Sequence, residues 1–152
     1  MTHQAEVQAI LAGARAERAA LLAQLSPALQ ASLPVDATGI SQALDHLGDA
    51  AGLDVHREQV EAHKTNAAVL HGRVFGRAPL SADTVLAAFV DGARVRAGML
   101  THLADAVGGE ELVIDVGRVL ERHPPDRDLP AAYEAQEHAA VVIARHLDEA
   151  AR

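Results

Sequence analysis

Hydrophobic residues recur at intervals of three and four along most of this chain, which places them on one face of an α-helix. No convincing run of alternating apolar and polar residues is present. Residues that favour helices, above all Ala, Leu, Glu and Arg, are abundant, whereas aromatic residues make up only 2% of the sequence. The pattern therefore predicts an all-α protein.

Four long helices and two short ones follow from the positions of the apolar stripes. The long helices are expected over residues 4–25, 54–75, 82–107 and 128–151, and the short ones over 39–51 and 110–123. In the first helix, one stripe is expected to be buried, and it contains Val7, Leu11, Ala14, Leu21 and Leu25. Three polar residues of this helix are expected to face away from that stripe: Arg15, Glu17 and Gln24.

Local signals mark several helix ends. Ser81 and Asp128 stand where N-caps are expected, because their side-chain oxygens can accept hydrogen bonds from the first turn of the following helix. Ser26, which is followed by proline, is expected to cap a further short turn of helix. Gly108–Gly109 is expected to end the helix that starts after Ser81.

Long helices joined by short turns pack most simply as an antiparallel bundle. We therefore expect a single domain over residues 1–152, an antiparallel four-helix bundle with one or two additional short helices. Alanine-rich faces allow helices to approach closely, but they bury little apolar area, and apolar burial contributes only about 25 cal/mol per Å². A homo-oligomer, most simply a dimer, would supply more buried surface.

Charge and composition exclude several classes of function. The net charge of −8 disfavours nucleic acids and anionic membrane surfaces as partners, and no apolar run is long enough to span a bilayer. The absence of cysteine excludes disulfides and thiolate chemistry. The first residues lack the basic and apolar regions of a secretory signal, so we expect a cytoplasmic location. No P-loop, G-x-S-x-G or G-x-G-x-x-G motif is present.

Histidine is the one unusual component, with nine residues in the chain. Imidazole is the commonest protein ligand for metals and also a general base. However, no two histidines are four residues apart, and the H-E-x-x-H and E-x-x-H motifs are absent. From His46 onward, the residue three positions before each histidine is apolar, so most imidazoles are expected at the edges of apolar stripes, along helix seams.

A segment of the predicted second helix nevertheless resembles a known family. Residues 38–50 read T-G-I-S-Q-A-L-D-H-L-G-D-A, the upstream L-L-A-Q-L segment is followed by a proline-containing turn, and Glu137-His138 lies in the last helix. These features are similar to the DinB/YfiT-like four-helix bundles. Some members of that family are metal-dependent thiol transferases, and many bind a divalent metal through three histidines.

The resemblance implies a candidate metal site. His46 matches the family's first ligand and His138 its second, whereas the third position falls on Val142, which cannot bind a metal. His146, one turn further along, and Glu134 are the residues that could replace it. The ion implied is a divalent metal such as Zn, Ni, Mn or Fe.

Two hypotheses about function follow, with a third behind them. The first is a non-enzymatic helical bundle that acts through self-association or other protein contacts. The second is a metal-dependent DinB-like protein, a thiol transferase or hydrolase in which the ion acts as a Lewis acid. The third is a pH switch, because nine imidazoles with ordinary pKa values near about 6.5 could gain charge together in mild acid.

Overall fold

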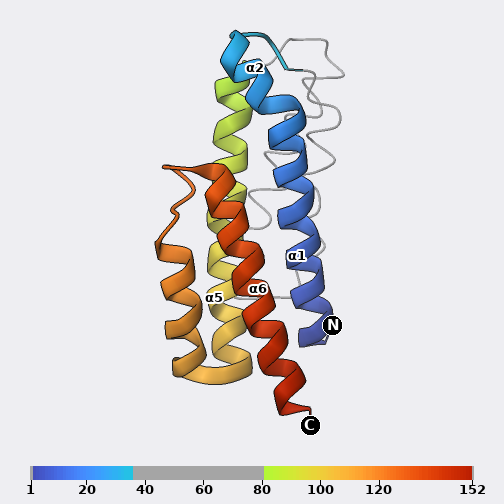
Figure 1. The fold of residues 1–152 in the computed structure, drawn as a ribbon, viewed down its shortest axis with the longest axis vertical. Helices are drawn as coiled ribbons and strands as arrows, with labels where there is room; N and C mark the ends of the chain where they lie inside the picture. Colours follow the sequence, from blue (N-terminus) through green and yellow to red (C-terminus); the bar gives the residue numbers. More distant parts are fainter. Residues whose placement is uncertain (1, 36–80, 152) are drawn as a thin grey trace.

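A computed structural model describes residues 2–35 and 81–151. Its helical elements in these ranges are α1 (His3–Ala20), the π-helical η1 (Leu21–Leu25), α2 (Ser26–Ala31), α5 (Ala82–Glu121) and α6 (Leu129–Ala150) (Figure 1). No β-strand occurs among them, so the predicted all-α class is confirmed for this part of the chain. The helices predicted over 39–51 and 54–75, together with His46, lie outside the described residues.

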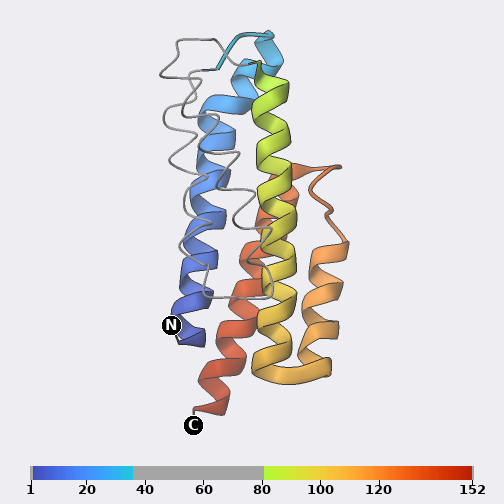
Figure 2. The ribbon, with the colours of Figure 1, turned by 180° about the vertical axis from the view of Figure 1, so that it is seen from behind.

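The helix α5 consists of two arms separated by a sharp turn. Gly109 has φ 69° and ψ −159°, a conformation that interrupts the helix and that side chains with a Cβ rarely adopt. Figures 1 and 2 show the arms before and after this turn running in opposite directions. The prediction that Gly108–Gly109 ends one helix and that another follows is confirmed. The second arm ends at Glu121, two residues earlier than predicted.

Two of the three predicted caps are confirmed, and the third is wrong. The Ser81 hydroxyl accepts a hydrogen bond from the Thr84 N–H at 3.2 Å, and the Asp128 carboxylate accepts one from the Ala131 N–H at 3.2 Å. Ser26 instead has helical angles, and its N–H donates to the Leu21 carbonyl.

Ser26 does not begin a new helix because of the proline that follows it. Pro27 has no N–H to donate to the carbonyl of Ala23, and its ring crowds that carbonyl. The helix continues past this point by widening into the π-turn of η1 and does not stop and restart. It ends at Ser32, which adopts the left-handed conformation with φ 53°.

The described helices lie side by side along the long axis of the molecule. α6 packs against both α1 and α5, and it begins well below the level that η1 and α2 reach (Figure 1). Two clusters of buried apolar residues form the core. One contains Leu21, Leu25 and Phe89, and the other contains Met99 and Ile143. Among residues 2–35 and 81–151 we find no helix with the length and apolar character that crossing a bilayer requires.

The apolar stripe predicted for α1 and η1 is confirmed, but the expectation for one polar residue of the same helix is wrong. All five of its apolar residues are buried, and Arg15 and Gln24 are exposed as expected. Glu17, which was expected to face away, is 0% exposed. Its carboxylate lies between the two apolar clusters, where it pairs with the buried Arg96 of α5.

Candidate functional site

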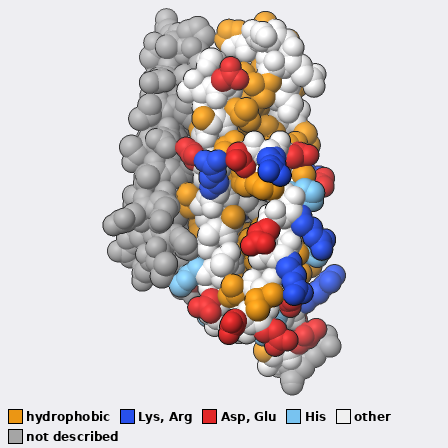
Figure 3. Space-filling view, turned by 90° about the vertical axis from the view of Figure 1, so that its left-hand side faces the viewer, with side chains coloured by type: hydrophobic (Ala, Val, Ile, Leu, Met, Phe, Trp, Pro, Cys, Tyr) orange, Lys and Arg blue, Asp and Glu red, His pale blue; other side chains and the backbone are white. Residues whose placement is uncertain are grey.

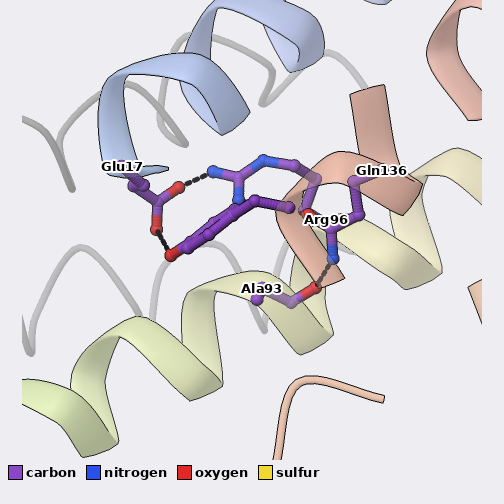
Figure 4. A network of polar contacts seen from close by, with 5 residues as sticks. Glu17, Ala93, Arg96 and Gln136 are labelled. Atoms are coloured by element: carbon purple, nitrogen blue, oxygen red, sulfur yellow. Dashed lines mark hydrogen bonds and ion pairs between the residues drawn. The ribbon is translucent and has the colours of Figure 1, made fainter. Parts of the chain in front are cut away.

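A layer of polar side chains crosses the core where the two apolar clusters meet. Glu17 comes from α1, Arg96 from the first arm of α5, and Tyr133 and Gln136 from α6 (Figure 4). Glu17, Arg96 and Tyr133 are 0% exposed, and Gln136 is 2% exposed. Buried charges are costly unless they are paired, so the contacts of these four side chains decide whether the fold can accommodate them.

The four side chains contact one another across three helices. Arg96 forms an ion pair with Glu17, and the Tyr133 hydroxyl donates to Glu17 Oε1 at 3.4 Å. Arg96 Nη1 donates to Gln136 Oε1 at 3.4 Å, and Gln136 Nε2 donates to the carbonyl of Ala93 at 2.7 Å. The Arg96 guanidinium also lies over the Tyr133 ring, 6.0 Å from its centroid.

Burial changes the proton affinity of two members of this layer. Loss of solvation disfavours the charged form of Arg96 and lowers its pKa to about 10, although the neighbouring Tyr133 acts against this shift. Loss of solvation also raises the pKa of Tyr133, while Arg96 partly opposes that change. At neutral pH the layer therefore contains a guanidinium cation and a neutral phenol.

The layer fits a structural role better than a catalytic one. It is closed to solvent, and none of the described pockets is lined by its side chains. Arg96 Nε has no hydrogen-bond partner within the described part of the chain, but the other groups are directed at one another. The arrangement connects α1, α5 and α6.

Sequence reasoning missed this layer, although a signal for it exists. In each of the three helices, buried residues recur at alternating intervals of three and four along the sequence. One of these buried positions in each helix is occupied by a polar residue. The buried positions are 7-10-14-17-21 in α1 and η1, 89-93-96-100-103 in α5, and 129-132-136-139-143 in α6. A Glu and an Arg in such positions on two helices are the pattern expected of a buried pair.

The predicted metal ligands are only partly brought together. Glu134 and His138 line one surface pocket of about 230 Å³ between α6 and the end of α5, and His123 and Arg122 line it too. His146 lies elsewhere, near the Gly108 turn, and is about 12 Å from His138 along the helix at 1.5 Å per residue. No three His, Asp or Glu side chains among the described residues are placed to hold an ion.

The expectation that histidines lie along helix seams is confirmed only in part. His102 and His146 are half-buried, as expected. His3, His123 and His138 are exposed, and for His123 and His138 the apolar residue three positions earlier did not bring the imidazole into a seam.

Apolar surface is a second candidate feature. Leu22 on η1 is 50% exposed and Leu33, just after α2, is 58% exposed; Ile114 on the second arm of α5 is 47% exposed. Figure 3 shows hydrophobic side chains reaching the surface in the upper half of one face, above a band of alternating acidic and basic groups. Leu33 lines a surface hollow with Leu29 and Pro34, whereas Leu22 lines a different one with Arg15, Arg18 and Glu137.

No family model, curated protein or solved structure matches this chain.

Proposed function

We propose that this chain is a non-enzymatic, cytoplasmic helical bundle that acts through protein contacts, first of all by self-association into a dimer. The observation that carries the proposal is the exposure of Leu22 and Leu33 at the end of the molecule formed by η1 and α2. Large apolar side chains left in water at one end favour association, because each fully buried leucine contributes about 1.5–3 kcal/mol.

The polar layer supports this interpretation. Its charged groups are directed at one another across the core, so the most unusual chemistry of the described residues serves to hold the helices together. We further propose that the complete fold is an antiparallel four-helix bundle, in which α1, the first arm of α5 and α6 are joined by the helix predicted over residues 54–75. The lengthwise packing of α6 on both α1 and α5 supports this architecture.

Sedimentation velocity over a wide range of concentrations tests the proposal. We expect a reversible equilibrium between a 15.9 kDa monomer and a dimer of twice that mass. A monomer at every concentration, up to the millimolar range, would contradict it.

A divalent-metal protein of the DinB-like type is the second candidate, and the shared pocket of Glu134, His123 and His138 favours it. A carboxylate and two imidazoles form a suitable donor set for Zn or Ni. Because the described side chains are not placed around one point, an ion would have to draw these surface groups together.

Calorimetric titration of the untagged protein with Zn²⁺ or Ni²⁺ tests this candidate. His138→Ala is expected to weaken binding, and His146→Ala, on the same helix but outside the pocket, serves as the matched control. Absence of binding by the unmodified protein, or an equal loss in both variants, would remove this pocket from consideration.

A further inference from the structure

We propose that Gly108–Gly109 is a hinge through which two copies of this chain exchange their C-terminal parts. In the exchanged dimer each α5 is one straight helix, and the second arm of α5 and α6 of one copy pack on α1 and the first arm of the other. The inference goes beyond the proposed function, because it does not depend on the exposed Leu22 and Leu33. Either of the two can hold without the other.

The turn between the arms of α5 is short for a pair of antiparallel helices. Among the described residues of α5, Gly109 alone departs from helical backbone angles, with φ 69° and ψ −159°. Antiparallel helices are ordinarily joined by about two to five residues. A change of these two angles to helical values would therefore join the arms into one helix. At 1.5 Å per residue, its 40 residues would be about 60 Å long.

Both glycines of the turn favour the folded-back form over the straight one. A Cβ at Gly109 would have to adopt a conformation that is essentially restricted to glycine. A Cβ at Gly108 would lie 2.7 Å from the Cβ of Leu112 and 3.1 Å from Nε2 of His146, closer than ordinary van der Waals contact. In a straight helix, Cβ atoms four residues apart are separated by about 5–6 Å, so Leu112 would leave room for a side chain at position 108. Glycine is also a poor residue for the interior of a straight helix.

The contacts of α6 do not require that the helices belong to one chain. Tyr133 of α6 donates to Glu17 of α1, and Gln136 of α6 accepts from Arg96 of the first arm. In the exchanged dimer the same layer forms twice, and each is completed by Tyr133 and Gln136 of the partner subunit. Exchange of an identical element conserves the buried contacts, so it is a low-cost route to a dimer once the hinge can straighten.

Alanine at the hinge tests the inference. In the double variant Gly108→Ala, Gly109→Ala, the folded-back turn is penalised at both positions while alanine favours the straight helix. We therefore expect the dissociation constant of the dimer to fall by about a hundredfold or more relative to the unmodified chain. Gly117→Ala is the matched control, because it adds a methyl group to helical backbone with open space in the second arm, and its constant should not change. Sedimentation velocity measures the constants.

Cross-linking shows whether a dimer forms by exchange. Arg94 Nη2 on the first arm and Asp126 Oδ2, in the segment between α5 and α6, are 3.8 Å apart. The chain has no cysteine, so Arg94→Cys chains and Asp126→Cys chains, both with the hinge alanines, can be refolded together and treated with a short bismaleimide. Exchange brings position 94 of one copy beside position 126 of the other. We expect a covalent dimer from the mixture and little from either variant alone.

A longer turn provides the opposite test. Four residues, Gly-Ser-Gly-Ser, inserted after position 109 of the hinge variant let the chain fold back without a constrained turn. We expect this insertion to return the protein to a monomer, because short and constrained hinges are the ones that favour exchange. Circular dichroism establishes that the variants remain helical.

The outcomes separate the exchange from the proposed function. If the hinge variant stays monomeric, does not fold, or gives a dimer without the 94–126 cross-link, the exchange is wrong and the proposed self-association is untouched. If the unmodified chain is monomeric at every concentration but the hinge variant gives the cross-linked dimer, the proposed function fails and the exchange stands. A dimer that persists unchanged after the insertion would also contradict the hinge.

Discussion

Arg96 of α5 and Glu17 of α1 form an ion pair in which neither side chain is exposed to solvent. The two residues come from helices far apart in the sequence, and Tyr133 and Gln136 of α6 complete their surroundings. A buried pair of this kind adds little net stability compared with apolar residues of the same volume, but breaking it leaves a buried charge without compensation. The pair therefore fixes which helix faces meet.

Removing one partner of this pair should be much more harmful than removing both. We expect Glu17→Gln to lower the free energy of unfolding by about 3–5 kcal/mol, and the double variant Glu17→Leu, Arg96→Met to recover most of that loss. Arg94→Gln is the control, because Arg94 is 55% exposed and its pairs with Asp91 and Asp126, at 3.9 and 3.8 Å, are worth at most about 1 kcal/mol. Urea denaturation measures all three, and equal losses for Glu17→Gln and Arg94→Gln would contradict the prediction.

The phenol of Tyr133 should resist ionisation in the folded protein. Burial raises its pKa above the ordinary value of 10.0, so the unfolded chain loses this proton first as the pH rises. The contribution of Tyr133 to stability is therefore complete below about pH 10 and decreases above it. Since this is the only tyrosine and the chain has no tryptophan, phenolate absorbance reports on Tyr133 alone.

An alkaline titration of the phenolate absorbance, in buffer and in urea, compares Tyr133 in the folded and the unfolded chain. We expect the absorbance change at a clearly higher pH in buffer, and no change at all in Tyr133→Phe. Coincident curves for the folded and unfolded chain would show that the phenol is accessible to solvent.

The turn between the arms of α5 should depend on the glycine at position 109. Gly109→Ala places a Cβ on a backbone with φ 69° and ψ −159°, a conformation essentially restricted to glycine, so we expect it to lower the free energy of unfolding by roughly 1–3 kcal/mol although the space around it is open. Gly117→Ala is the matched control, because it also has open space but lies in helical backbone, where alanine should stabilise by up to about 1 kcal/mol. Thermal melts should therefore shift in opposite directions, and two shifts of the same sign would be evidence against this account of the turn.

The N-cap of α6 should contribute measurably to stability. In Asp128→Ala the hydrogen bond to the Ala131 N–H is lost, and we expect a decrease of about 1 kcal/mol in the free energy of unfolding. Asp128→Asn retains an accepting oxygen and should cost much less. A loss as large in the asparagine variant as in the alanine variant would point to the charge of Asp128 and not to capping.

The sequence alone was sufficient for features that depend on near neighbours. The caps at Ser81 and Asp128, the end of a helix at Gly108–Gly109 and the apolar stripe of α1 are set by residues within one or two turns, so the local pattern of residues predicts them correctly. The prediction for Ser26 was wrong because the backbone accommodates the missing N–H of Pro27 with a wider turn and does not end the helix.

Only the tertiary structure decided which polar groups meet. A glutamate in a helix is ordinarily solvated, and Glu17 is buried because α5 brings the opposite charge of Arg96 to the same level of the core. Likewise, the packing of α5 on α6 brings His123 to Glu134 and His138, while two further turns of α6 carry His146 away to the Gly108 turn. Local sequence specifies where helices begin and end, because hydrogen bonds within a helix are short-range; the pairing of charges depends on which helix faces pack together, and that is settled only when the whole core forms.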